Sequence, residues 1–195
     1  KFILNDKIKN IDSYLGLMLS EFLREEENLK GTKVGCNAGD CGSCTVLIDN
    51  KACCSCLVTL AKVQNKKVET IEGIKKSELF AKLKDSFSYY GAAQCGICTP
   101  GMLMASVALL RKNNNPTVQE VEEALSGVLC RCTGYRKILQ AVSNVNKRFK
   151  KELSIEPTNA VGKRLERLDG KEKIDGTDIF GDDYYPKNSL IVKVI

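Results

Sequence analysis

Histidine and tryptophan are both absent from this chain of 195 residues, and aromatic residues make up only 6% of it. Without histidine, no Ser-His or Cys-His pair can form within the chain, which excludes nucleophilic catalysis of that kind. With so few aromatic residues, the hydrophobic cores should consist mostly of leucine, isoleucine, valine and alanine. A Walker A motif and a G-x-G-x-x-G motif are also missing, so a nucleotide-binding site is not expected.

Long hydrophobic runs are missing as well. No segment reaches the ~18 consecutive apolar residues of a membrane-spanning helix, and residues 1–6 turn polar too soon for a signal peptide. We therefore expect no membrane span and a cytoplasmic, reducing location. In such a compartment, clustered cysteines bind metal more often than they form disulfides.

Cysteine, in contrast, is abundant, and eight of the ten cysteines fall into two groups of four. The first group has the spacing C-x4-C-x2-C with a fourth cysteine after eleven residues: Cys36, Cys41, Cys44 and Cys56. The second group joins a C-x2-C pair to a C-x-C pair: Cys95, Cys98, Cys130 and Cys132. The opening of the first group is the plant-type spacing for a 2Fe–2S cluster. Two clusters in one small chain predict an electron relay rather than a binding module.

Glycine residues punctuate the first cysteine group at Gly35, Gly39 and Gly42. Glycines let a loop turn its backbone N–H groups toward the sulfurs, where they offset the negative charge of a bound cluster. The fourth cysteine, Cys56, follows the second of two predicted hairpins. In the second group, residues 95–98 enter a predicted helix, whose N-terminus favours negative charge. The C-x-C pair cannot place both sulfurs on one helix face, so that segment should be non-helical.

Other uses of the cysteines remain open on spacing alone. Two zinc sites are the main alternative, because zinc commonly uses C-x2-C pairs, although three ligands within nine residues are unusual for it. A disulfide scaffold does not suit a reducing location, and a Rieske centre is excluded because it needs two histidines. Cys53 and Cys54 lie outside both groups, either as small apolar residues of a strand or, for Cys54, as an alternative ligand.

The formal net charge of +6 does not indicate a nucleic-acid partner. Two 2Fe–2S sites with four thiolates each would contribute about −4 and leave a net charge of about +2. The basic residues are dispersed, and the densest run, residues 147–151, is short and is followed at once by Glu152. A solvated helix end explains this run better than a nucleic-acid patch does. We therefore expect no nucleic acid among the partners.

The fold class that the pattern predicts is α+β. Residues 1–75 are predicted to form a ferredoxin-like β-grasp domain with one helix, residues 15–23, which Asp12 or Ser13 could cap. Its short strands are expected at residues 1–4, 7–11, 45–48, 52–56 and 67–71, with hairpin turns after the first and the third. The glycine-rich stretch at residues 34–42 should be a loop.

Residues 76–153 are predicted to form an all-α domain with the second cysteine group at helix ends. Its four helices are expected near residues 79–87, 99–110, 117–125 and 135–149. Pro100 suits the start of the second helix, and Thr117 with Glu120 forms a capping box for the third. Residues 154–195 are predicted to be a linker, extended as far as residue 176, with a terminal strand at residues 189–195. That strand either pairs with a partner or leads into a further domain.

Three stretches together resemble the iron–sulfur domain of the molybdenum hydroxylases, the xanthine dehydrogenase and aldehyde oxidoreductase family. They are VGCNAGDCGSCTV at residues 34–46, QCGICTPG at residues 94–101 and CRCTGY at residues 130–135. The resemblance covers roughly residues 1–150, and the order of the three motifs makes it highly specific. Residues 169–183 resemble, more weakly, the segment that leads into the molybdenum domain in fused members.

The resemblance implies a role for each cysteine group. The group that begins at Cys36 would hold the 2Fe–2S cluster distal to molybdenum, and the group that begins at Cys95 would hold the proximal one. Gln94 and Cys132 would be neighbours of the pterin of the molybdenum cofactor. On its residue type alone, Gln94 is equally explained as a helix-start residue that bonds to backbone. No catalytic residue is expected within this chain.

The resemblance also implies a function, that of the electron-transfer component of a molybdenum-dependent hydroxylase of the xanthine or aldehyde dehydrogenase type. Electrons would leave the molybdenum cofactor, held by a molybdenum-binding subunit or by a C-terminal continuation of this chain. They would pass through two 2Fe–2S clusters to FAD in another subunit or to an external acceptor. Two other hypotheses stay open: a stand-alone two-cluster carrier of the ferredoxin type for another oxidoreductase, and a zinc-stabilised interaction module.

Overall fold

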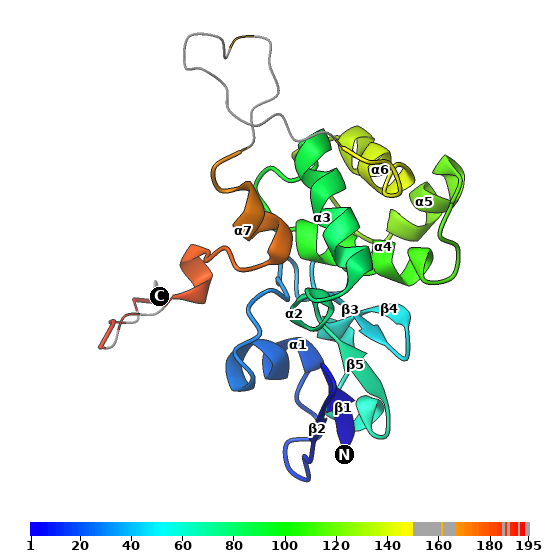
Figure 1. Cartoon of the computed structure of the whole chain (residues 1–195). Helices are drawn as coiled ribbons and strands as arrows, with labels where there is room; N and C mark the ends of the chain where they lie inside the picture. Colours follow the sequence, from blue (N-terminus) through cyan, green and yellow to red (C-terminus); the bar gives the residue numbers. More distant parts are fainter. Residues whose placement is uncertain (150–160, 162–166, 185, 187, 191, 194–195) are drawn as a thin grey trace.

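The computed structural model describes residues 1–149, 161, 167–184, 186, 188–190 and 192–193. Figure 1 shows a sheet-containing region at the bottom of the view, a helical region above it, and a C-terminal segment beside both. The predicted α+β class is therefore confirmed. Among the described residues, no helix has the length and apolar character that crossing a membrane requires.

The N-terminal sheet has five strands in the order β2-β1-β5-β3-β4. They are β1 (Phe2–Leu4), β2 (Lys7–Lys9), β3 (Thr45–Ile48), β4 (Lys51–Cys54) and β5 (Lys67–Glu69). Strands β1 and β5 pair in parallel, and the other neighbours pair antiparallel. Each hairpin turns through two residues with positive φ, Asn5 and Asp6 in the first and Asp49 and Asn50 in the second, as type I′ turns require. Both predicted hairpins and the fifth strand are thus confirmed.

The first predicted helix begins later than expected. It consists of α1 (Leu19–Glu21) and a π-helical continuation, η1 (Phe22–Glu26). The expectation of a helix from residue 15, capped by Asp12 or Ser13, is therefore wrong at its start. The preceding residues bind a neighbouring segment instead, because the Ala61 N–H donates to the Leu15 oxygen at 2.9 Å. Tertiary hydrogen bonding overrides the helical pattern there.

The helical region contains the four predicted helices and a short additional one. They are α2 (Ile71–Ile74), α3 (Glu78–Tyr90), α4 (Thr99–Leu110), α5 (Val118–Leu125) and α6 (Arg136–Ser143). The capping box of Thr117 and Glu120 opens α5 as predicted. Helix α6 ends at Ser143 rather than near residue 149, and the next residue, Asn144, caps it.

Strand β3 joins the two regions through its alternating side chains. Val46 and Ile48 belong to the core under the sheet, together with Leu19 of α1. Leu47, one residue away, belongs instead to the core around α4. Successive strand residues point to opposite faces, so one face of β3 packs on α1 and the other on the helical region. Helix α4 is buried on nearly all sides, at the centre of the molecule.

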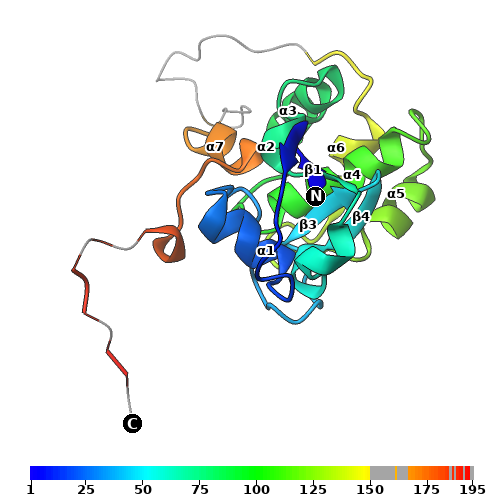
Figure 2. The same cartoon turned by 90° about the horizontal axis from the view of Figure 1, so that it is seen from below.

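The C-terminal segment differs from the predicted extended linker. Helix α7 (Gly170–Asp175) lies beside α3, in orange in Figure 1, and is followed by a 3-10 turn, η5 (Gly181–Asp183). Ile174 of α7 is buried in the helical core, which explains why this segment folds rather than staying extended. Residues 150–160 and 162–166 lie outside the described part. Figure 2 shows the chain leaving the body after η5.

The predicted terminal strand falls only partly within the described residues. Ser189, Leu190, Val192 and Lys193 are described and none of them is in a strand, while residues 191, 194 and 195 lie outside the description. Leu190 and Val192 are 91% and 88% exposed. These apolar side chains thus have no cover from the described part of the chain.

Candidate metal centres

The first cysteine group lies where the predicted loop meets the sheet. Cys36 is exposed and Cys41 is half-buried on the loop, whereas Cys44, directly before β3, is buried. Cys56 is also buried and sits on η2 (Ser55–Leu57), the 3-10 turn directly after β4. The loop is folded back on itself through left-handed conformations, with φ of +83° at Gly39 and +68° at Gly42. The fold therefore brings all four predicted residues to one end of the β3–β4 hairpin.

Backbone amides of the loop point at one of the sulfurs. The N–H groups of Ala38 and Cys41 donate to Cys36 Sγ at 3.3 and 3.4 Å. These bonds lower the pKa of Cys36 to about 7, which favours the thiolate, the form that binds metal. Burial, with a contact to the Cys44 thiol, raises the pKa of Cys56 to about 12. A bound cation would therefore favour the thiolate of Cys56.

The second cysteine group gathers two segments of the helical region. Cys95 and Cys98 precede α4, Cys130 follows α5, and Cys132 precedes α6 in a segment that is non-helical, as predicted. The Sγ atoms of Cys95 and Cys132 are 3.4 Å apart, and both residues are exposed. Cys98 and Cys130 are buried. Burial raises the pKa of Cys98, and the neighbouring Cys130 thiol raises it further.

The thiols of each group are arranged in pairs. In the first group Cys36 contacts Cys41 and Cys44 contacts Cys56, and in the second group Cys95 contacts Cys132 and Cys98 contacts Cys130. Cys44 also contacts the thiol of Cys54, which lies outside both groups. A 2Fe–2S core takes four thiolates, two for each iron. The donor set thus fits two two-iron clusters.

The two remaining cysteines lie on opposite faces of β4. Cys53 packs against the sheet core, as expected of a small apolar strand residue. Cys54 faces the first group, with its Sγ 3.9 Å from the Gly39 oxygen. Burial raises the pKa of both thiols. Cys54 is therefore a neutral neighbour of the first group in this structure.

Gln94 lies in the turn before Cys95 and is exposed. Its backbone oxygen accepts a hydrogen bond from Arg167 Nη1 at 2.7 Å. Arg167 lies 73 positions away in the C-terminal segment, and no local pattern predicts this contact. Within the part of the chain that the structure describes, the Gln94 side chain has no hydrogen-bond partner.

The two cysteine groups meet at a contact that sequence reasoning missed. The N–H of Leu129, the residue before Cys130, donates to the Cys41 oxygen at 2.9 Å. Beside this bond the chains approach closely, because a Cβ on Gly42 would lie 2.1 Å from the Gly127 oxygen. Only glycine fits at Gly42, on grounds of both its positive φ and this contact. Glycines at positions 42 and 127 were the only local hint of the approach.

Comparisons with known proteins show the family of this chain. The 2Fe–2S binding domain family matches residues 70–143. The nicotine 6-hydroxylase small subunit of Paenarthrobacter nicotinovorans is 45% identical over 124 residues, which are 64% of this chain and 74% of that protein. The xanthine dehydrogenase iron–sulfur-binding subunit of Escherichia coli is 42% identical over 134 residues, 68% of this chain and 84% of that one.

A solved structure shares the whole arrangement. Aldehyde oxidoreductase from Desulfovibrio desulfuricans matches with a TM-score of 0.85 at 31% identity, over 96% of this chain and 22% of that one. This chain thus spans about a fifth of that enzyme but most of the two bacterial subunits. The chain therefore belongs to the iron–sulfur components of the xanthine dehydrogenase and aldehyde oxidoreductase family, the electron-transfer parts of the molybdenum hydroxylases.

Proposed function

We propose that this chain binds two 2Fe–2S clusters and relays electrons from a molybdenum-binding partner to an acceptor. The observation that carries the proposal is the 2.9 Å hydrogen bond from the Leu129 N–H to the Cys41 oxygen, which joins the two cysteine groups. When bound, the clusters supply one-electron redox steps. Two clusters in series let the two electrons of an oxidation leave the partner one at a time.

The paired thiols suggest how each cluster is held. In the first group, Cys36 and Cys41 would bind one iron, with the other iron taken by Cys44 and Cys56. In the second group, the contacts divide the ligands into Cys95 with Cys132 and Cys98 with Cys130. The amides on Cys36 Sγ offset the negative charge of the first site.

The route between the groups consists almost entirely of covalent bonds. It runs along the backbone from Cys130 to Leu129, crosses one hydrogen bond to the Cys41 oxygen, and continues through Cys41 to its thiol. The chains approach closely beside this crossing, at Gly42. The chain's own contribution is thus a fixed connection between two donor sets.

Exposure of the outer cysteines supports an entry and an exit for electrons. Cys95 and Cys132 are exposed in the second group, next to Gln94, which we propose as the face toward the pterin of the molybdenum cofactor. Cys36 is exposed in the first group and would face FAD in another subunit or an external acceptor. The buried cysteines of each group lie between these ends.

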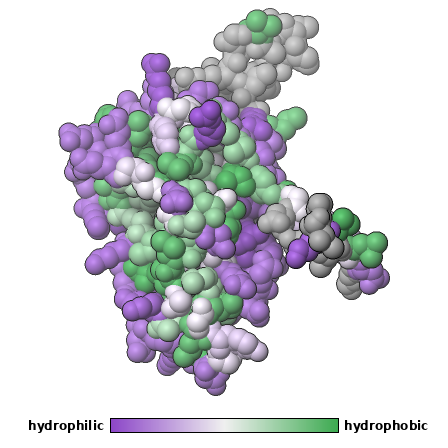
Figure 3. All heavy atoms as spheres, turned by 180° about the vertical axis from the view of Figure 1, so that it is seen from behind, coloured by the Kyte–Doolittle hydropathy of each residue, from purple (hydrophilic) through white to green (hydrophobic). Residues whose placement is uncertain are grey.

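The proposed partner is a molybdenum-binding subunit or a continuation of this chain. Apolar residues gather over the middle of the face in Figure 3, with hydrophilic residues at its margins, as is typical of an interaction surface. The exposed Leu190 and Val192 offer a further apolar contact. That partner would oxidise a carbon centre with oxygen from water, and it would carry the residues that select the substrate.

Copurification from the native source tests this proposal against the stand-alone carrier. A tagged chain should retain molybdenum and pterin, together with about four irons per chain, through size-exclusion chromatography. A tagged chain that carries its iron but neither molybdenum nor pterin would favour the ferredoxin-type carrier. A colourless protein with zinc in place of iron would support the interaction module instead.

A further inference from the structure

Residues 167–183, which we call the strap, lie across both regions of the molecule. The middle of the strap is α7, whose Ile174 is buried in the helical core. One end of the strap reaches the second cysteine group, and the other end reaches the residues just before the first. The strap therefore contacts the approaches to both proposed clusters, although it contains no cysteine.

The first end of the strap lies on the turn that carries Cys95. Arg167 Nη1 donates to the Gln94 oxygen at 2.7 Å. The aliphatic part of Lys173 covers Gly96, whose φ is +92°, and a Cβ on Gly96 would lie 3.0 Å from it. Asp178 accepts from Lys173 Nζ at 2.6 Å and holds this side chain in place.

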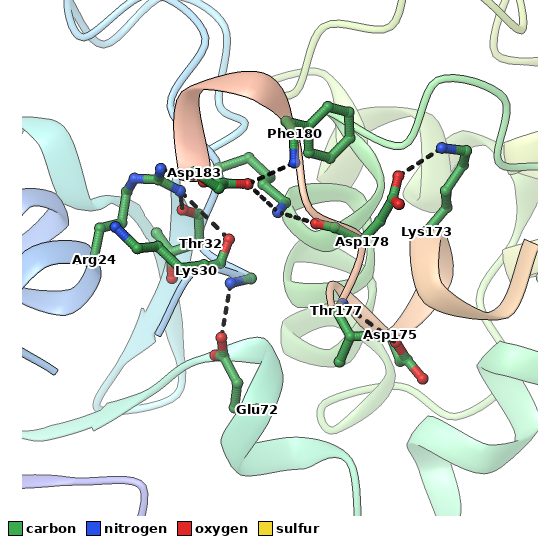
Figure 4. A network of polar contacts seen from close by, with 12 residues as sticks. Arg24, Lys30, Thr32, Glu72, Lys173, Asp175, Thr177, Asp178, Phe180 and Asp183 are labelled. Carbon is green, nitrogen blue, oxygen red and sulfur yellow. Dashed lines mark hydrogen bonds and ion pairs between the residues drawn. The ribbon is translucent and has the colours of Figure 1, made fainter. Parts of the chain in front are cut away.

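The second end of the strap is an ion cluster that excludes water, shown in Figure 4. Asp183 pairs with Arg24 of η1 and, at 3.4 Å, with Lys33, three residues before Cys36. The three side chains are only 4%, 9% and 3% exposed. Lys33 Nζ also donates to the Asp178 oxygen at 2.9 Å and lies 4.7 Å from the centre of the Phe180 ring.

The charges of this cluster are divided between the strap and the body. Both cations, Arg24 and Lys33, belong to the N-terminal region, while the carboxylate and the ring belong to the strap. Burial lowers the pKa of Lys33 despite its contact with Asp183. Two buried cations without a carboxylate are strongly unfavourable, and they regain water only when the strap detaches. The Asp183 carboxylate thus stabilises the closed position of the strap, together with the burial of Ile174.

We propose that the strap braces the turns before both cysteine groups, and that Asp183 is the positioning residue that closes it. The importance of this brace for electron transfer rests on the proposed function. The existence of the brace is independent of that function, because all its contacts are within the chain. Loss of the Asp183 charge should therefore release the strap as a unit, including its far end on the Cys95 turn.

Hydrogen exchange of the cluster-loaded full chain tests the proposal in Asp183→Asn. The amides of Gly170 and Lys173, hydrogen-bonded within the strap, lie at the end far from residue 183. Their exchange should accelerate by roughly a hundredfold, as expected when a buried pair loses one partner. Asp183→Glu, which keeps the charge, should restore much of the protection. Glu78→Gln, which removes an exposed pair with Lys82, is the matched control and should change nothing.

EPR of the reduced protein adds a readout that a purely local role would not affect. In Asp183→Asn both cluster signals should persist, while the line shape of the second signal changes as its turn is released. Faster hydrogen exchange limited to residues 178–184, with an unchanged EPR signal from the second cluster, would contradict the proposal that Asp183 holds the whole strap. If Asp183→Asn fails to fold, Phe180→Leu removes the ring contact without stranding a charge and should show the same pattern at smaller amplitude. A wild-type chain that binds no cluster would refute the proposed function. The hydrogen exchange of wild type and Asp183→Asn would still show whether Asp183 holds the strap in place.

Discussion

Cys41 is the residue at which cluster binding and electron transfer would meet. Its thiol belongs to the first cysteine group, and its backbone oxygen accepts the hydrogen bond from Leu129. Cys54 lies beside the same group, with its thiol against that of Cys44, but it is not one of the proposed ligands. The two cysteines therefore provide matched variants, one that removes a proposed ligand and one that removes only a neighbouring thiol.

We predict that Cys41→Ser removes one of two EPR signals and leaves the other, because serine takes one thiolate from the first group only. Iron should fall from about four to about two per chain. Cys54→Ser should retain both signals and all the iron. Two unchanged signals in Cys41→Ser would mean that the ligand assignment is wrong.

Local spacing predicted the eight cysteines that the fold gathers, because ligand spacing is a short-range property of the chain. It did not predict which thiols pair, since Cys95 contacts Cys132 across 37 positions. The contact of Leu129 was not predictable either, because its donor is a backbone N–H, which almost every residue type has. Asp183 and Arg24 are 159 positions apart, and no local pattern connects them.

At the scale of elements, the loop of the first cysteine group depends on its packing against the turn after α5. Gly42 combines a φ of +68° with a Cβ position 2.1 Å from the Gly127 oxygen. Gly91, which ends α3, has a similar φ of +61° but has only ordinary contact, 3.7 Å, with the tip of Lys137. Substitutions at the two glycines thus distinguish the cost of the left-handed conformation from the cost of disturbing the contact between loop and turn.

We predict that Gly91→Ala costs about 1–2 kcal/mol of unfolding free energy, from the left-handed conformation alone. Gly42→Ala should cost about 1–3 kcal/mol more, because the added methyl group also collides with backbone. Thermal unfolding of the two variants, followed by circular dichroism, measures the difference. Equal losses in both would show that the loop does not pack on the turn as described.

Elements with local signals were predicted well, and those set by distant contacts were not. The capping box at Thr117 and the hairpin turn at Asp49 and Asn50 were recognisable because their bonds lie within a few residues. The start of α1 was mistaken because residues that suit a helix bind the backbone near Ala61. Helix α7 was missed because its short span owes its burial to Ile174 and the helical core.

At the scale of the whole molecule, the sheet and the helical region are joined by an ion pair as well as by apolar packing. Arg111, at the end of α4, donates two hydrogen bonds to the Glu69 carboxylate of β5, at 2.7 and 3.2 Å. The Arg111 guanidinium lowers the pKa of Glu69, despite an opposing effect of burial. This pair should help to fix the two regions relative to each other.

Glu69→Gln should therefore lower the free energy of unfolding by about 1–3 kcal/mol at pH 7. Because the folded-state pKa is depressed, the contribution is present above the ordinary pKa of 4.5 and is lost as pH falls through the folded value. The difference in melting temperature between wild type and variant should therefore shrink as the pH falls below 4.5. A difference that is constant from pH 7 to the acid limit would contradict this, and Glu78→Gln serves as the exposed control.

The central claim is that two 2Fe–2S clusters lie in series within this chain. EPR of the dithionite-reduced protein, with iron and acid-labile sulfide counted on the same sample, tests it most directly. We predict two distinct 2Fe–2S signals and about four irons and four sulfides per chain. A single signal with about two irons, or zinc in place of iron, would contradict the relay.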